Sequence, residues 1–404
     1  MSDLWIAPYH RDAIPEGIDN STFGESVSLV SPFEADEALG CSRSKYAESR
    51  LLPASRIFPS DSDIRNNVYA ACEASVERAI CGPLPTNVFF PDSAALVESD
   101  STHKFLTESL WHSEIFFSKF ARCDRTTDWK YRIDKSFSPI NIKGMVANAY
   151  HRYSYQYFHW FFESMPRVWA LQKELQTKKL IWFAGPLDQK FHRQSLEILD
   201  LDLDHFLRID GSAAVRFEAA YNVSFRFTEN INTLRPDFNS GRYNVGWSDD
   251  YVFDLRDRAS EKVKSLSGLI NGEKLYIARP DTTHRKVINE REVISLLERY
   301  GFEVFVPGTK SLYEQIAAFK KARVIVGPHG AGFTNIMWSN PGAVVLEFMP
   351  AALLDVGYRF LSNFAGHSHN VILCKELPHP QGNAYANIEV DLMVLQRALK
   401  EILA

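Results

Sequence analysis

Residues 324–335 read VIVGPHGAGFTN, and this stretch decides the fold class. A short apolar run rich in β-branched residues ends in a glycine-rich turn, and the residues after the turn can be helical. A strand, a glycine turn and a helix start leave unpaired backbone N–H groups at one point, with the helix dipole behind them, which suits a phosphate. Gly330 and Gly332 would let a ligand approach the backbone closely. Many α/β turns use glycine only to turn, so the neighbouring segments have to support this interpretation.

Apolar runs alternate with amphipathic segments on both sides of this stretch. The predicted strands of this half are 274–279, 302–306, 324–327, 343–348 and 371–374. Asn289 with Glu292, and Ser311 with Glu314, have the spacing of capping boxes and predict helices between these strands. Such alternation predicts a parallel, doubly wound sheet that binds ligands beyond the carboxyl ends of its strands.

The first half of the chain is less regular but is also interpreted as α/β. Its predicted strands are 86–90, 180–184, 206–209 and 217–227, and its predicted helices are 69–80, 105–120 and 189–200. A charged helix over 250–272 ends in Asn271-Gly272, which is a helix stop. We therefore expect an N-terminal domain over 1–265 with an irregular extension, a C-terminal domain over 266–380, and a terminal segment over 381–404. That segment predicts an amphipathic helix, 391–403, which needs a docking surface.

Composition limits the classes of function. The 404 residues carry a net charge of -5, which gives no general attraction to nucleic acid or anionic lipid. The five cysteines are scattered and form no C-x-x-C pair, so we expect buried thiols in a reducing compartment rather than a zinc site or disulfides. No signal peptide and no apolar run of membrane-spanning length is present. We expect a soluble, cytoplasmic protein; peripheral attachment to a membrane and the oligomeric state stay open.

Two arginines follow the first strand of the C-terminal half. Arg279 stands at the strand end and Arg285 lies six residues later in a loop. Beside a phosphate-binding turn, they can make charge-assisted contacts with a diphosphate. The alternative is a surface arginine paired with Asp281 or Glu290.

Polar residues in and near the glycine turn are further candidates. Glu347 ends a buried strand, where a charge is costly unless it is paired or faces a ligand, and a ribose diol would suit it. A salt bridge at the rim of the sheet is the alternative. His329 could donate to a phosphate or satisfy local carbonyls. Thr334 and Asn335 could cap the helix or bind the nucleotide.

His159 and Glu163 lie four residues apart within an aromatic segment, so they share a face if the segment is helical. An imidazole or carboxylate in such surroundings can act as a general base. A helical ion pair or a structural histidine near Pro166 is the alternative. A metal site is disfavoured because H-x3-E lacks a third ligand and neither HExxH nor DxD occurs.

Several motifs occur together in a familiar order: FHWFFESMPR (158–167), YIAR (276–279), Arg285 with Asn289-Glu290, SLYEQ (311–315), GPHGAGFTN (327–335) and PGAVVLE (341–347). This set resembles glycosyltransferase family 61, whose bacterial members include capsular polysaccharide biosynthesis proteins. The resemblance covers roughly residues 145–350, and residues 1–130 add nothing to it.

The resemblance implies a GT-B fold, in which two Rossmann-like domains face each other across a cleft and the final helix crosses back to the N-terminal domain. It also implies inverting transfer without an essential metal, from a nucleotide sugar, for which a UDP-sugar is the first choice. The acceptor would be a glycan or glycolipid, and a glycolipid acceptor would place the protein at the inner face of the membrane. Glu163 is the favoured base and His159 the second choice. The donor-binding residues would be Arg279, Arg285, Asn289, His329, Gly330, Ala331, Gly332, Thr334, Asn335 and Glu347.

Three other functions compete with this interpretation. A nucleotide-sugar epimerase could use the same architecture without a separate acceptor. A catalytically silent subunit of a polysaccharide assembly would bind the donor and show no turnover. A dinucleotide oxidoreductase is disfavoured, because no G-x-G-x-x-G follows a strand.

Overall fold

The structure is a computed structural model. It describes residues 23–30, 43–58, 71–90, 95–98, 104–106, 121–124, 130–134, 140–151, 153–175, 180–185, 187–207, 215–229, 248–266, 272–280, 282, 284–351, 353, 355–377 and 385–404.

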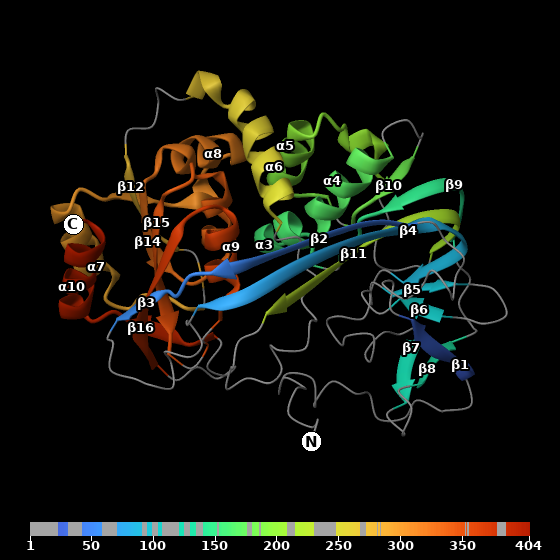
Figure 1. The fold of residues 1–404 in the computed structure, drawn as a ribbon, viewed down its shortest axis with the longest axis horizontal. Helices are drawn as coiled ribbons and strands as arrows, with labels where there is room; N and C mark the ends of the chain where they lie inside the picture. Colours follow the sequence, from blue (N-terminus) through green and yellow to red (C-terminus); the bar gives the residue numbers. More distant parts are fainter. Residues whose placement is uncertain are drawn as a thin grey trace.

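The C-terminal half forms a mainly parallel sheet with the order β13-β12-β14-β15-β16-β17 (Figure 1). Its strands are β12 (Lys274–Ile277), β13 (Glu303–Phe305), β14 (Val324–Pro328), β15 (Val344–Pro350), β16 (Ser368–Leu377) and β17 (Asn387–Glu389). Only β17 pairs antiparallel. Every residue of β14 is buried, as expected for a parallel strand covered on both faces. The predicted doubly wound α/β pattern is therefore confirmed for this half.

The helices of this half are α7 (Glu290–Arg299), α8 (Leu312–Lys321), the 3-10 helix η10 (Ala331–Trp338), α9 (Gly357–Phe364) and α10 (Leu392–Ile402). The capping box of Ser311 and Glu314 is present at the start of α8. The predicted cap of Asn289 on α7 is wrong. The Asn289 side chain instead pairs with the backbone of Val390, donating to its carbonyl and accepting from its N–H.

Helix α10 packs on the C-terminal sheet. Its main contacts are with α7 and β16, and Leu395, Ala398 and Leu399 are buried in the same cluster as Tyr276. Figure 1 shows α10 beside α7, at the end of the molecule away from β9 and β10. The expected crossing of this helix to the N-terminal domain is therefore corrected. Its apolar stripe is satisfied by covering the nearer sheet.

The N-terminal half is built on a mixed sheet with the order β10-β9-β11-β4-β5-β6-β1-β8-β7, and β2 also pairs with β4. Its strands are β1 (Phe23–Val30), β2 (Arg43–Leu52), β4 (Cys72–Phe90), β5 (Ala95–Glu98), β6 (Lys104–Leu106), β7 (Ala121–Asp124), β8 (Lys130–Asp134), β9 (Ile140–Asn148), β10 (Ile181–Phe183) and β11 (Val215–Glu229). Strands β10, β9 and β11 run parallel, whereas β4 runs antiparallel to β11 and β2.

Several predicted elements of this half are wrong. Residues 72–80 form a strand rather than a helix, because Cys72, Ala74 and Val76 alternate with more exposed neighbours and fit one face of a sheet. Residues 104–106 are a strand where a helix was expected from 105, and 107–120 lie outside the described residues. At 206–207 only a bridge between Phe206 and Trp182 is present, and 208–209 lie outside the described residues.

Helices α4 (Met165–Glu174), α5 (Lys190–Ile198) and α6 (Asp249–Lys262) lie on one side of the long strands (Figure 1). One hydrophobic cluster runs from Trp160 through Leu255 to Ile325 and Phe333. The two halves therefore share a continuous core. Helix α6 contributes to it from between them, and its Arg256 donates to the carbonyls of Met337 and Ala365.

Residues 43–58 connect the two sheets. Strand β2 pairs with β4 in the N-terminal sheet, and β3 (Arg56–Phe58) pairs in parallel with β16 in the C-terminal sheet. Arg359, which is fully buried, donates to the carbonyl of Pro53 between these strands. An early segment of the chain thus completes the edge of the late sheet.

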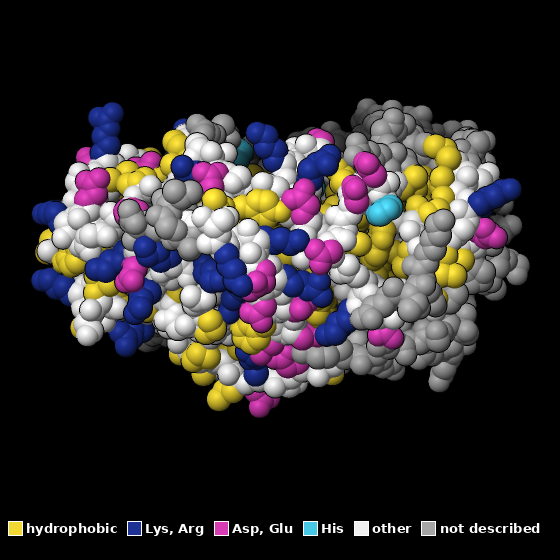
Figure 2. Space-filling view, turned by 90° about the horizontal axis from the view of Figure 1, so that it is seen from above, with side chains coloured by type: hydrophobic (Ala, Val, Ile, Leu, Met, Phe, Trp, Pro, Cys, Tyr) yellow, Lys and Arg dark blue, Asp and Glu magenta, His cyan; other side chains and the backbone are white. Residues whose placement is uncertain are grey.

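Among the described residues, no helix is both long and apolar enough to span a bilayer. On the described part of the face shown in Figure 2, lysine and arginine side chains are interspersed with aspartate and glutamate. This mixture agrees with the small net charge.

Candidate active site

Glu163 lies in a π-helical turn within a continuous helix. Helix α3 (Tyr157–His159) passes into the π-turn η5 (Trp160–Ser164) and then into α4. Pro166 has no N–H, so it cannot bond a carbonyl in the preceding turn. The hydroxyl of Tyr251 donates instead to the carbonyl of Phe161 at 2.7 Å. Such π-turns are frequent at functional sites, and here the turn carries the predicted base.

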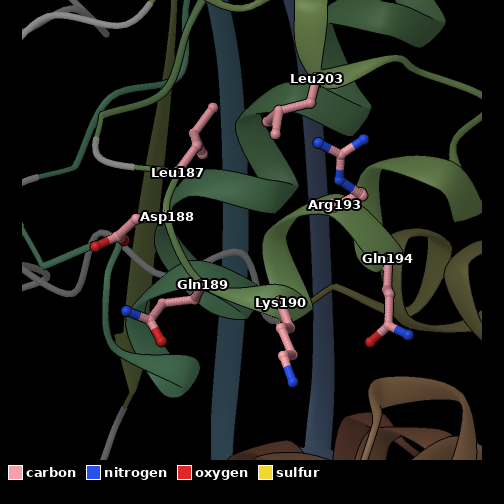
Figure 3. A pocket seen from close by; sticks show the side chains of 7 residues that line it. All are labelled: Leu187, Asp188, Gln189, Lys190, Arg193, Gln194 and Leu203. Carbon is pink, nitrogen blue, oxygen red and sulfur yellow. The ribbon is translucent and has the colours of Figure 1, made fainter.

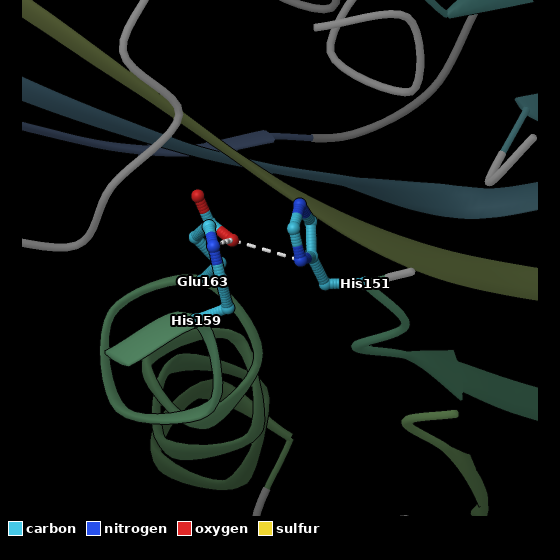
Figure 4. Close-up of side chains that lie close together, drawn as sticks. All are labelled: His151, His159 and Glu163. Atoms are coloured by element: carbon cyan, nitrogen blue, oxygen red, sulfur yellow. Dashed lines mark hydrogen bonds and ion pairs between the residues drawn. The ribbon is translucent and has the colours of Figure 1, made fainter. Parts of the chain in front are cut away.

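His151, His159 and Glu163 form a compact cluster (Figure 4). Oε2 of Glu163 lies 2.8 Å from Nδ1 of His151 and 2.5 Å from Nδ1 of His159. The side chain of Glu163 is 1% exposed, whereas that of His159 is 23% exposed. The structure confirms that His159 and Glu163 share a face, and it adds His151. Sequence reasoning missed His151 because it lies in a loop, outside any helical spacing.

The loop that carries His151 is fixed from α5. Nε2 of His192 lies 2.9 Å from the carbonyl of Ser154, and its Nδ1 accepts from the N–H of Gln189. Burial lowers the pKa of His192 to about 4, so the ring is neutral. Its one proton is on Nε2, which donates a hydrogen bond to the carbonyl of Ser154. The N–H of Ser154 in turn donates to the carbonyl of His151. The position of His151 therefore depends on a neutral histidine behind it.

Two imidazoles and a carboxylate could also hold a metal ion. The ligand atoms of His151, His159 and Glu163 all lie within 4.8 Å of one another. The H-x3-E pair was expected to lack a third ligand, and this expectation is wrong because the fold supplies His151.

Arg279 and Arg285 stand beside the glycine turn. Nη1 of Arg279 donates to the carbonyl of His329 at 2.7 Å, and a side chain at Gly330 would overlap its guanidinium. Burial lowers the pKa of Arg279, and the positive charge of Arg285 lowers it further. Neither arginine forms an ion pair with any residue that the structure describes. Of the alternative partners, Glu290 accepts from the hydroxyl of Tyr276, and Asp281 lies outside the described residues. Two neighbouring guanidinium groups could bind an anion.

Glu347 is fully buried and engages two histidines. Oε1 lies 2.6 Å from Nδ1 of His329, and Oε2 lies 3.0 Å from Nε2 of His369. Burial alone would raise the pKa of Glu347, but His329 and His369 outweigh it and hold that pKa below its usual value. Both carboxylate oxygens thus pair with histidines, which is the ion-pair alternative, and a contact of Glu347 with a ribose diol stays a prediction.

The remaining predicted donor-site residues divide into two groups. Gly330 has φ 154 and ψ 177, a conformation open mainly to glycine, and Ala331 and Gly332 begin η10 beside it. Thr334 and Asn335 are buried behind the turn. The amide of Asn335 donates to Gln315 and its carbonyl oxygen accepts from Tyr157, so Asn335 connects elements instead of facing a ligand.

The two clusters meet through an aromatic contact. The ring of Phe158 lies 5.7 Å from that of Tyr358, which lies 5.3 Å from that of His329. Phe158 is the neighbour of His159, and Tyr358 belongs to α9. The structure therefore places the carboxylate–histidine cluster and the arginine cluster on adjoining elements.

A separate hollow of about 430 Å³ lies at the start of α5 (Figure 3). Its lining residues are Leu187, Asp188, Gln189, Lys190, Arg193, Gln194 and Leu203. None of these belongs to either cluster, so we do not assign the donor or the base to this hollow.

Residues 157–346 match the family model described as Glycosyltransferase 61. The match begins at the helix that carries His159 and Glu163 and ends next to Glu347, so it includes the π-turn, both arginines and the glycine turn. The resemblance inferred from the motifs is thereby confirmed. No curated protein matches the chain.

Proposed function

Over residues 157–346 this chain belongs to glycosyltransferase family 61, and we propose that it transfers a sugar with inversion, without a metal, from a nucleotide sugar to a hydroxyl group. A UDP-sugar is the proposed donor. The acceptor is a glycan or glycolipid in surface polysaccharide synthesis at the cytoplasmic side of a membrane. One observation carries the proposal: Arg279 and Arg285 have no acidic partner among the described residues and lie next to the glycine turn.

The arginine pair suits the diphosphate of the donor. A diphosphate supplies the negative charge that the two guanidinium groups lack, and it would pair with both through short, charge-assisted hydrogen bonds. The backbone N–H groups at the start of η10 add a partial positive charge at the same point. Because these groups can neutralise the departing diphosphate, the transfer does not require a metal for that purpose.

Inverting transfer is a single in-line displacement at the anomeric carbon. The acceptor oxygen forms the new bond to this carbon, and the bond to the diphosphate oxygen breaks, leaving its electron pair on the diphosphate. The proton of the acceptor hydroxyl passes to a base. We assign the role of this base to His159, because its side chain is more exposed than that of Glu163. Glu163 is the buried hydrogen-bond partner of His159. This assignment reverses the order of preference drawn from sequence.

The architecture gives each half a role. The C-terminal sheet binds the donor at the carboxyl ends of its parallel strands, and the elements around η5 present the acceptor and the base. This division of roles is the one that the expected GT-B architecture would give. The shared core predicts that the two halves move little relative to each other when the donor binds.

Calorimetric titration in EDTA against UDP-, GDP-, CMP- and dTDP-sugars tests the proposal. We expect one donor to bind with micromolar affinity and Arg279→Ala or Arg285→Ala to abolish that binding. Arg258→Ala is the matched control, because Arg258 is exposed on α6 and paired with Asp254. Binding that needs added metal, or that ignores both substitutions, contradicts the proposal. Binding without turnover on any acceptor would favour a silent binding subunit.

A further inference from the structure

A buried chain of hydrogen bonds leads from the N-terminal segment to the glycine turn. Oγ of Ser55 lies 3.0 Å from Nδ1 of His369, whose Nε2 lies 3.0 Å from Oε2 of Glu347. Oε1 of Glu347 lies 2.6 Å from Nδ1 of His329. All four residues are buried. Ser55 comes from the connection between β2 and β3, 314 positions before His369.

The charge on Glu347 fixes the positions of the protons. An ionised carboxylate only accepts hydrogen bonds, so Nε2 of His369 and Nδ1 of His329 must each donate to it. Nδ1 of His369 shares a hydrogen bond with the hydroxyl of Ser55. For His329, Nε2 is the remaining nitrogen, and it has no hydrogen-bond partner among the described residues.

We infer that Ser55 and His369 are positioning residues, which act through Glu347 to hold His329 as an imidazolium that carries a proton on both nitrogens. Nδ1–H then donates to Glu347, and Nε2–H donates to the diphosphate of the donor. This inference rests on the proposed function. His329 is then a third group on the anion besides Arg279 and Arg285. It contributes a directed hydrogen bond, while the electron pair of the breaking bond stays on the diphosphate and the proton of the acceptor goes to His159.

The surroundings of His329 support this direction. Arg279 donates to its carbonyl from the end of β12, and Tyr358 of α9 packs against its ring. Glu347 is the only acid paired with His329 among the described residues. Since Glu347 occupies Nδ1, the ring cannot rotate to exchange its two nitrogens without breaking the bond to a buried charge.

Ser55 and His369 lie outside residues 157–346, the part of the chain that the family model matches. The segment that carries Ser55 is also held in place by Arg359, through the carbonyl of Pro53. Glu347 also lies just outside the matched region, so the chain of hydrogen bonds enters that region only at the bond between Glu347 and His329.

A double-mutant cycle tests the inference, with inorganic pyrophosphate in EDTA as the calorimetric probe. We expect Ser55→Ala to weaken pyrophosphate binding by about three- to ten-fold, the range of one buried hydrogen bond. His369→Ala should do at least as much, and Ser55→Thr, which keeps the hydroxyl, should restore most of the affinity. In a His329→Gln background, Ser55→Ala should have no further effect. Ser260→Ala is the matched control, because Ser260 loses a similar bond, to the carbonyl of Arg256, away from the site.

The outcomes separate the inference from the proposed function. If the unaltered chain does not bind pyrophosphate, both are wrong. Substitutions at Arg279 and Arg285 could abolish pyrophosphate binding while substitutions at His329 and Ser55 leave it unchanged. In that case only the inference is overturned. If Ser55→Ala weakens binding equally with and without His329, Ser55 acts through general packing and the inference is also overturned. Thermal melting of each variant checks that it is folded.

Discussion

Gly330 and Arg279 fit together as a pair, because a Cβ atom at position 330 would overlap the guanidinium of Arg279. The arginine reaches across the turn to the carbonyl of His329 only because residue 330 has no side chain.

Gly330→Ala should therefore weaken donor binding by displacing Arg279. We expect a loss of at least about ten-fold in affinity, since a charge-assisted contact is worth roughly 1.5–3 kcal/mol. Isothermal calorimetry with the tightest-binding donor measures this loss of affinity. Gly342→Ala separates backbone strain from collision, because Gly342 also has positive φ (94) but open space around it. Equal losses of donor affinity in both variants would contradict the explanation.

Glu163→Gln and His159→Ala should each reduce turnover by about 100-fold or more, because each removes part of the base. Donor affinity should change little, since the arginine cluster is intact. If the two residues act as a unit, the double variant should lose no more turnover than the single variant with the lower turnover. Glu261→Gln, an exposed change on α6, is the control. Steady-state kinetics measures the turnover. Unchanged turnover in either variant would contradict the assignment of this pair as the base.

Tyr251→Phe should destabilise the protein by about 1–3 kcal/mol, because it leaves the carbonyl of Phe161 buried without its donor. Pro166→Ala supplies a backbone N–H in the next turn, so the loss of stability should be smaller in that background. Urea unfolding of the four proteins gives the interaction energy. Strictly additive losses would show that Pro166 is not the reason for the π-turn.

The free energy of unfolding should fall as pH is lowered from 7 to 5. Burial lowers the pKa of His192 and of His367 to about 4, against about 6.5 in the unfolded chain. Between these values the unfolded state binds more protons, so acid favours unfolding. Each histidine should cost about 2 kcal/mol at pH 5 relative to pH 7.

His192→Gln tests this dependence, because glutamine can still donate to Ser154 but does not titrate. The variant should lose less stability than the unaltered protein between pH 7 and pH 5, as measured by urea unfolding at both values. An unchanged pH dependence would rule out the buried neutral state of His192.

The sequence predicts the C-terminal half well, because its signals are local. Ser311 and Glu314 cap a helix through adjacent turns, and the buried run before Gly327 can only be a covered strand. The strand at 72–80 was missed because pairing with β2 and β11, both distant in sequence, decides it. His151 depends on a loop conformation, and Ser55 meets His369 only after the whole chain has folded. Glu347 was identified as a buried charge, but its partners could not be read from spacing.

The pairing of β3 with β16 has a consequence for the timing of biosynthesis. Ser55 leaves the ribosome 314 residues before His369, which at 5–20 residues per second is roughly 15–60 s. During this interval β3 has no partner in the C-terminal sheet, and its three residues expose only a short edge to other nascent chains. The edge of the C-terminal sheet is therefore completed by a segment that is made long before its pairing partner.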